Sequence, residues 1–272
     1  MPDFTTSDGL RLHYQDRGEG QPILCLSGLT RNSTDFDYLA PHLDDARMIA
    51  LDYRGRGRSD WGDPASYTVP VEARDVVELL DHLGLGSAAV IGTSRGGLIA
   101  MILAAMAKDR LAGVCLNDIG PEIAPEGLDV IMGYIGRNPS QKTHAEAVAV
   151  RANLMAGFAN VPESRWRQEV EKHYEETDEG LVINYDPALA ETVRAGGAEP
   201  AADLWPAFDA LGGLPLACIR GANSDLLSPA TFAEMQARRP DMVAAEVPDR
   251  GHVPFLDEPR ALDAIARWRA LM

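Results

Sequence analysis

The stretch VIGTSRGGLIA, residues 90–100, decides the fold that we expect for this chain. An apolar run leads into it, Gly92 and Gly96 flank Ser94, and small and apolar residues follow. A Gly-x-Ser-x-Gly pattern between a strand and a helix is typical of a strained turn that lifts the serine hydroxyl out of a sheet. The pattern therefore predicts a strand, a sharp turn and a helix. The alternative interpretation is that the glycines only reverse the chain and the serine is incidental.

Other short apolar runs end in Gly, Asn or Asp and alternate with helical patterns, as the run at 88–94 does. They lie at residues 22–28, 46–55, 111–118, 214–225 and 242–252. Continuous apolar strands of this kind are buried on both faces, which is typical of a parallel sheet. Residues 9–18 alternate instead and predict an edge strand in an antiparallel hairpin. The fold class that we expect is α/β, with a doubly wound, mostly parallel sheet.

The alternation of strand and helix stops between residues 121 and 211, where helical patterns such as 143–159 and 162–176 dominate. We interpret this segment as a mostly helical cap, or lid, inserted before the last two strands. The expected core is then formed by residues 1–120 and 212–272. An apolar insertion above the carboxyl ends of the strands is where a cover for a substrate would lie.

Composition excludes several classes of partner. Of 272 residues, 46% are apolar, so the chain can form a sizeable core. A net charge of −16 without a Lys/Arg cluster argues against binding to nucleic acid or to anionic membranes. The amino terminus lacks the features of a signal peptide and no apolar run has membrane-spanning length, so we expect a cytoplasmic protein.

The three cysteines, Cys25, Cys115 and Cys218, are expected to be buried and reduced. No Cys/His cluster has the spacing of a metal site.

A serine attacks near neutral pH only if a base takes its proton, and a histidine is the usual base. His252 lies on a loop beside Gly251, directly after the last predicted strand, and we expect it to be that base. The other histidines fall in helical patterns or on the alternating strand, where surface or packing roles are expected: His13, His42, His82, His144 and His173.

The acid that orients the histidine is expected to follow a strand at the same edge of the sheet. Asp225 lies just beyond the strand in 214–225 and precedes His252, in the order Ser, Asp, His. Asp118 also closes a strand and is the competing candidate. Asp249 ranks third because it is close in sequence to His252.

The oxyanion that forms during acyl transfer needs donors, which are usually two backbone N–H groups. We expect one from Arg95, the residue after the serine. The second should come from the loop after the strand at 22–28, with Leu29 as the first candidate and Thr30 as the next.

Over nearly its full length, the chain resembles the lid-bearing members of the α/β-hydrolase superfamily. The resemblance rests on five segments: Ser27-Gly28-Leu29, DYRGRGRSD at 52–60, the turn at Ser94, RGANSDLLS at 220–228 and RGHVPFLDEP at 250–259. It implies that residues 52–59 form a structural loop that supports the oxyanion corner. Ser27 stands where the family usually has a histidine that braces this corner, which affects the expected position of the Leu29 N–H group but not the triad.

The residues and the resemblance together predict a serine hydrolase that uses Ser94, His252 and Asp225 on a small, largely apolar ester or lactone, without a cofactor or metal. The motifs are shared by relatives that cleave C–C bonds of ring-cleavage products and by cofactor-free haloperoxidases, or perhydrolases, so these activities stay open. A receptor that uses the same fold to bind a small molecule is the alternative that is not an enzyme. The serine disfavours the relatives with an aspartate nucleophile.

Overall fold

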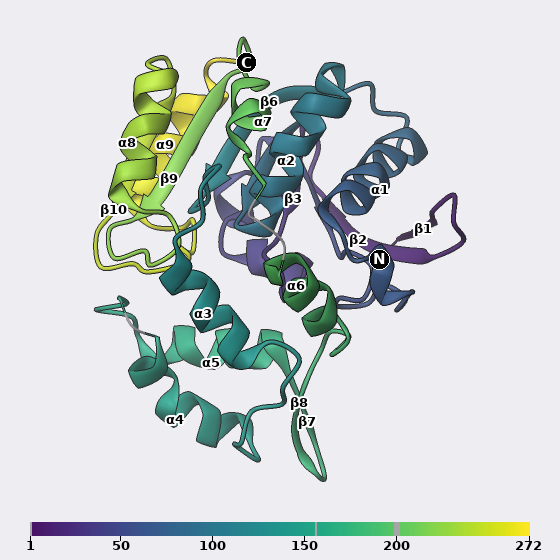
Figure 1. Cartoon of the computed structure of the whole chain (residues 1–272), viewed down its shortest axis with the longest axis vertical. Helices are drawn as coiled ribbons and strands as arrows, with labels where there is room; N and C mark the ends of the chain where they lie inside the picture. The colour runs from purple at the N-terminus through teal and green to yellow at the C-terminus, as the bar shows by residue number, and fades with distance from the viewer. Residues whose placement is uncertain (1, 156, 199–201) are drawn as a thin grey trace.

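The computed structural model describes residues 2–155, 157–198 and 202–272. Its main feature is an eight-stranded sheet with the order β1-β2-β4-β3-β5-β6-β9-β10 (Figure 1). The strands are β1 (Asp3–Thr5), β2 (Arg11–Arg17), β3 (Gln21–Leu26), β4 (Ala46–Leu51), β5 (Ala88–Thr93), β6 (Leu111–Asn117), β9 (Leu216–Gly221) and β10 (Val243–Val247).

From β4 to β10 every pair of neighbouring strands is parallel. The parallel strands from β3 to β9 are buried along most of their length, as their continuous apolar runs predict. β1 and β2 form the expected antiparallel hairpin, but β2 is not the edge strand, because it also pairs antiparallel with β4. The predicted fold class, α/β with a doubly wound and mostly parallel sheet, is confirmed.

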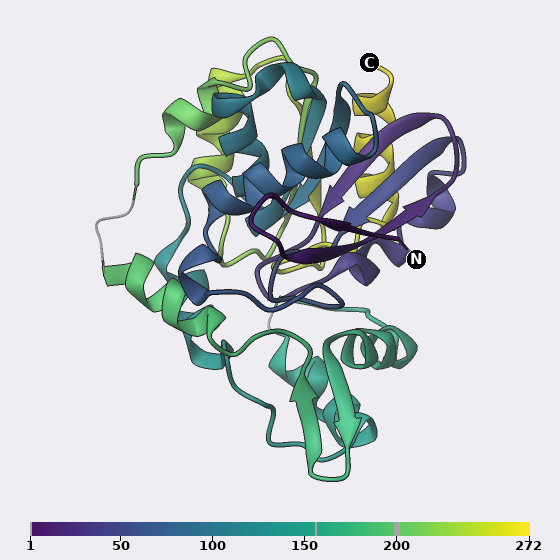
Figure 2. The same cartoon turned by 90° about the vertical axis from the view of Figure 1, so that its right-hand side faces the viewer.

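Helices cover both faces of this sheet and close two apolar cores (Figures 1 and 2). One core packs α1 (Val69–His82), α2 (Arg95–Met106) and α8 (Pro229–Arg238) against the sheet. The other packs α9 (Pro259–Arg269) together with the short 3-10 helices η1 (Ser33–Asp37) and η2 (Ala40–His42). Two further 3-10 helices lie in loops, η3 (Pro64–Ser66) and η4 (Lys108–Arg110).

The chain between β6 and β9 forms a mostly helical segment that lies beside the sheet (Figure 1). It contains α3 (Pro125–Tyr134), α4 (His144–Leu154), α5 (Glu163–His173), the strands β7 (Tyr174–Thr177) and β8 (Gly180–Ile183), α6 (Leu189–Ala198) and α7 (Trp205–Asp209). The antiparallel β7–β8 hairpin was not expected from the sequence. α7 packs on α2, and Phe208 lies in a core of the sheet domain. The exact boundaries of the cap therefore remain a prediction.

Along the described ranges, no helix combines the length and the apolar character that crossing a membrane requires.

Candidate active site

Ser94 lies in a sharp turn between β5 and α2 and has a positive φ of 50°. A positive φ is unfavourable for a residue with a side chain, so the surrounding contacts must hold it in place. The Ser94 N–H donates to the carbonyl of Asn117 at 3.0 Å, and the Gly96 N–H donates to the carbonyl of Ser27 at 3.1 Å. A Cβ atom at Gly96 would overlap the carbonyl oxygen of Leu26, which explains the glycine at this position. The turn predicted from the sequence is therefore present.

His252 lies on the loop after β10 and faces Ser94. Its Nε2 atom is 2.9 Å from the Ser94 Oγ atom, which is hydrogen-bonding distance. The structure thus brings together the serine and the histidine that the sequence singled out.

Asp118, and not Asp225, is the carboxylate at His252. The Asp118 Oδ2 atom lies 2.7 Å from the His252 Nδ1 atom, and Asp118 is completely buried. Two further donors hold this carboxylate, the Gly221 N–H at 2.7 Å and the Ser224 hydroxyl at 2.6 Å. An ionised carboxylate can only accept, so Nδ1 donates to it and the neutral ring presents Nε2 as an acceptor to the serine.

The prediction of Asp225 as the acid is therefore wrong. The Asp225 side chain is exposed, and nowhere in the described ranges does it bond to His252. The reason is topological: β6 and β9 are neighbouring parallel strands, so Asp118 and Asp225 leave the sheet at the same edge. Asp118 follows β6 directly and turns inward, whereas the loop after β9 uses Ser224 to contact Asp118 and leaves Asp225 in solvent. The third candidate, Asp249, has a different partner: its carboxylate accepts a hydrogen bond from the Asn160 side chain at 2.9 Å.

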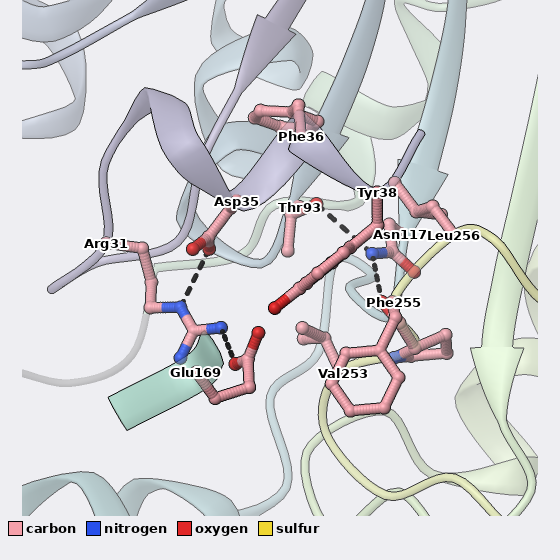
Figure 3. Close-up of a pocket in the computed structure, with 11 residues that line it drawn as sticks. Arg31, Asp35, Phe36, Tyr38, Thr93, Asn117, Glu169, Val253, Phe255 and Leu256 are labelled. Atoms are coloured by element: carbon pink, nitrogen blue, oxygen red, sulfur yellow. Dashed lines mark hydrogen bonds and ion pairs between the residues drawn. The ribbon is translucent and has the colours of Figure 1, made fainter. Parts of the chain in front are cut away.

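Asn117 holds the histidine loop in place, a role that the sequence did not suggest. Its side-chain amide donates to the Thr93 hydroxyl at 3.1 Å and to the Pro254 carbonyl at 3.2 Å. Asn117 and Thr93 immediately precede Asp118 and Ser94, and Pro254 follows His252 by two residues. One buried amide therefore links the three segments that carry the hydrogen-bonded side chains (Figure 3).

The expected oxyanion corner lies next to the nucleophile. A Cβ atom built on Gly28 would be 3.8 Å from the Ser94 Cβ atom. Arg95 is the first residue of α2, and Leu29 follows Gly28. No described residue accepts a hydrogen bond from the backbone N–H of Leu29 or of Arg95. The role of both groups as oxyanion donors remains a prediction.

Tyr53 supports the backbone of this corner at Ser27. The Tyr53 hydroxyl donates to the Ser27 carbonyl at 3.1 Å, and the same carbonyl accepts from Gly96. Both Ser27 and Tyr53 are buried. The backbone of the corner is thus fixed through its carbonyl group rather than through the side chain at residue 27.

Glu72 connects two arginines behind the corner. It lies 2.8 Å from the Arg56 Nη1 atom and 2.6 Å from the Arg95 Nε atom, through different carboxylate oxygens. Arg56 also donates from Nε to the Leu29 carbonyl at 3.0 Å, and Arg95 donates from Nη2 to the Tyr67 carbonyl at 2.9 Å. The sequence did not indicate this role of Glu72, because in an amphipathic helix a glutamate is expected on the solvent face.

A small cavity of about 20 Å³, room for about one water molecule, lies beside Asn117 and Thr93 (Figure 3). Charged residues from the loop after β3 and from α5 meet there. The Arg31 Nε atom lies 2.7 Å from Asp35, and its Nη2 atom lies 2.8 Å from Glu169. These ion pairs join the inserted segment to the core close to Gly28, since Arg31 also packs against that glycine.

His173 of α5 belongs to the same cluster. Its Nε2 atom lies 3.1 Å from Asp35, and its Nδ1 atom lies 3.2 Å from Arg31. The neutral ring satisfies both contacts, because it can donate to Asp35 and accept from Arg31. Burial lowers the pKa of His173 below its ordinary value, and the charge of Arg31 lowers it further. The expectation of a surface or packing role missed this buried polar contact.

Comparisons with known proteins agree with the fold. The profile of the alpha/beta hydrolase family matches residues 23–265. The chain is 38% identical to 3-hydroxybutyrate-oligomer hydrolase of Cupriavidus necator, over 92% of this chain and 89% of the relative. It is 31% identical to 2-(acetamidomethylene)succinate hydrolase of Mesorhizobium japonicum, over 89% of this chain and 85% of the relative. Among solved structures, an alpha/beta hydrolase from Novosphingobium aromaticivorans is similar with a TM-score of 0.92 and 39% identity, covering 100% of this chain and 98% of the other.

Proposed function

Because the chain belongs to the alpha/beta hydrolase family, we propose that it cleaves a small, largely apolar ester or lactone through an acyl-enzyme intermediate on Ser94. The observation that carries this proposal is the continuous hydrogen-bonded chain from Asp118 through His252 to Ser94, with distances of 2.7 Å and 2.9 Å. This arrangement is the one that turns a serine hydroxyl into a nucleophile.

In the first half of the reaction His252 Nε2 takes the proton of the Ser94 hydroxyl, while Oγ attacks the carbonyl carbon. The carbonyl π-electrons move to the oxygen, and the backbone N–H groups of Leu29 and Arg95 stabilise the resulting anion. Asp118 keeps the ring oriented and stabilises its positive charge. The tetrahedral intermediate then collapses, and His252 gives its proton to the departing alcohol oxygen.

In the second half a water molecule attacks the acyl-enzyme. His252 takes a proton from the water as the new C–O bond forms, and returns it to Ser94 Oγ when the acid leaves. One water is consumed, and one carboxylic acid and one alcohol are released; a lactone releases both groups on one molecule.

A panel of small esters and related compounds tests the substrate class. The relative from Cupriavidus necator is named for oligomers of 3-hydroxybutyrate, in which an ester bond joins each hydroxyl to the next carboxyl group. We therefore place short esters of hydroxy acids beside p-nitrophenyl acyl esters and lactones in the first substrate panel. Ring-cleavage products with a vinylogous diketone belong in the same panel, because C–C bond hydrolysis uses the same nucleophile.

A fluorophosphonate probe followed by digestion tests the nucleophile. We expect the label on Ser94, and we expect Ser94→Ala to remove both labelling and esterase turnover. Labelling at another serine, or full ester turnover by Ser94→Ala, would overturn the proposal. Turnover of ring-cleavage products alone would show that the enzyme cleaves a C–C bond and not an ester bond. Ligand-dependent thermal shifts without turnover of any substrate would favour a receptor.

A further inference from the structure

The proposed mechanism uses Ser94, His252 and Asp118 and gives no role to the buried carboxylate of Glu72. Glu72 has no exposed surface and lies on α1, a helix that carries none of the catalytic residues. A buried carboxylate has a large desolvation cost unless charged or hydrogen-bonding partners compensate it. Its partners are Arg56 and Arg95, at 2.8 Å and 2.6 Å.

Arg56 and Arg95 are each connected to one of the two expected donors of the oxyanion hole. On one side Arg56 donates to the Leu29 carbonyl at 3.0 Å, and so fixes the peptide that follows the Leu29 N–H group. On the other side Arg95 itself carries the second N–H, and its side chain is held by Glu72 and by the Tyr67 carbonyl. The two donors come from different loops, after β3 and after β5, and Glu72 connects their supports with its two carboxylate oxygens.

We propose that Glu72 is a positioning residue for the oxyanion hole, which sets the relative placement of the Leu29 and Arg95 N–H groups through one shared carboxylate. This inference rests on the proposed function, because it presumes that those two groups stabilise the tetrahedral oxyanion. Glu72 does not touch the substrate. Its effect on the reaction is indirect, and it appears at the step where negative charge develops on the carbonyl oxygen.

Geometry explains why one carboxylate has this influence. Donors of an oxyanion hole act at distances of about 2.7–3.1 Å, and a misplacement of about 1 Å can lower the rate by about 100-fold. Without the negative charge of Glu72, the guanidinium groups of buried Arg56 and half-buried Arg95 lose their shared counter-ion and repel each other. Burial lowers the pKa of Arg56 below its ordinary value, and the charge of Arg95 lowers it further, so the two guanidinium groups interact. Their separation would displace the loops to which they are attached.

The chain contains a matched control on the same helix and loop. Asp75 lies three residues after Glu72 on α1, and Arg54 lies two residues before Arg56. The Arg54–Asp75 ion pair is equally buried, with a distance of 2.6 Å and 1% exposure on both side chains. The other partners of the two side chains are Asp8 and Arg74. The Arg54 carbonyl also accepts from Arg56 Nη1 at 2.6 Å, but this is a backbone group that a substitution of Asp75 keeps. Loss of this pair therefore tests general destabilisation without touching either N–H donor.

The experiment compares Glu72→Gln with Asp75→Asn, at a temperature where both variants are folded. The readouts are kcat and KM for a p-nitrophenyl acyl ester, and Ki for an alkyl trifluoromethyl ketone. Ser94 Oγ adds to the ketone carbonyl and His252 receives its proton, so the adduct carries an oxyanion in the same hole. We expect Glu72→Gln to lower kcat by about 10- to 100-fold and to raise Ki by a similar factor, with KM changed by less than about threefold.

Asp75→Asn is expected to lower Tm by about 5–15 °C and to leave kcat and Ki within about twofold of the wild type. The proposal is overturned if Glu72→Gln keeps the wild-type kcat and Ki, or if Asp75→Asn changes kcat and Ki by as much as Glu72→Gln does. It is also overturned if Glu72→Gln raises KM by the same factor as Ki. If Glu72→Gln does not fold, kcat, KM and Ki of Glu72→Asp and Arg95→Met are compared by the same criteria. Arg95→Met is suitable because it removes the guanidinium group but keeps the backbone N–H donor.

Ser94→Ala in the same assays separates the two proposals. Ester turnover that survives Ser94→Ala overturns the proposed function. Turnover that requires Ser94 but is unaffected by Glu72→Gln overturns only the role of Glu72.

Discussion

Asp118 and His252 are 134 positions apart in the chain, yet the Asp118 Oδ2 atom lies 2.7 Å from the His252 Nδ1 atom. The contact forms because β6 ends directly before Asp118 and β10 leads into the loop of His252, at the same edge of the sheet. A parallel sheet places the carboxyl ends of its strands side by side, so residues from distant segments can meet there.

Replacement of the acid should separate Asp118 from Asp225. Asp118→Asn presents an amide that donates toward Nδ1, so the ring is held in the wrong tautomer, and we expect kcat to fall by about 10³- to 10⁴-fold. Asp225→Asn changes an exposed side chain and should keep kcat within about twofold. Steady-state kinetics on one ester substrate provide the measurement, and equal losses in the two variants would contradict the assignment.

The nucleophile turn should tolerate no side chain at residue 96. Gly96→Ala would place a methyl group against the Leu26 carbonyl, and we expect a loss of about 3 kcal/mol or more in the free energy of unfolding. Gly133→Ala in α3 is the control, because its new methyl group meets no heavy atom within 4 Å and alanine favours a helix. It should raise stability by about 0.5–1 kcal/mol. Urea unfolding of both variants decides, and similar stabilities would contradict the geometry of the turn.

The cluster at His173 should make stability depend on pH. The folded-state pKa of His173 lies below its ordinary value of 6.5, so between the two values the unfolded chain binds more protons than the folded one. The stability that this group contributes is present above about pH 6.5 and is lost as the pH falls toward the lower folded value. Protonation would also place an Nδ1–H donor against Arg31, which has no lone pair to accept it.

His173→Gln should therefore flatten the slope of unfolding free energy between about pH 7 and pH 5. His42→Gln, at an exposed position, should leave the slope unchanged. Urea unfolding across this range tests the prediction, and an unchanged slope in His173→Gln would argue against it. Asp35 and Glu169 face the same ring, and the charge of Arg31 helps to hold the pKa of each carboxyl below its ordinary value, so both stay ionised in the folded chain across this range.

Tyr53→Phe tests the support of the oxyanion corner at Ser27. The variant leaves the buried Ser27 carbonyl with the Gly96 N–H as its remaining donor. We expect a loss of about 1 kcal/mol in stability and a decrease of several-fold in kcat with little change in KM. Tyr14→Phe is the matched control, because Tyr14 is also buried in the core and its hydroxyl bonds to no described residue. A kcat equal to that of Tyr14→Phe would show that the corner needs no hydroxyl at residue 53.

Local patterns in the sequence were sufficient for the elements of the sheet and for the turn at Ser94. Continuous apolar runs predict buried parallel strands, because each strand meets the same apolar surroundings on both faces. The glycines at 92 and 96 predict the turn. A side chain at either position would overlap nearby backbone atoms, so the tight turn requires glycine at both. The choice of His252 was also possible from the sequence, because the other histidines fall in helical patterns or on the alternating strand and only His252 directly follows a predicted parallel strand.

The sequence could not determine which carboxylate contacts His252, since Asp118 and Asp225 both follow neighbouring parallel strands. Nor could it reveal that Glu72 connects Arg56 with Arg95, or that His173 is buried between Arg31 and Asp35. These contacts join segments that are distant in the chain, and no local periodicity encodes the direction in which a loop turns. By itself the sequence determined the buried parallel strands of the sheet and where the serine turns. Tertiary packing decided which buried charges meet, because a buried ion is stable only beside a partner that another segment supplies.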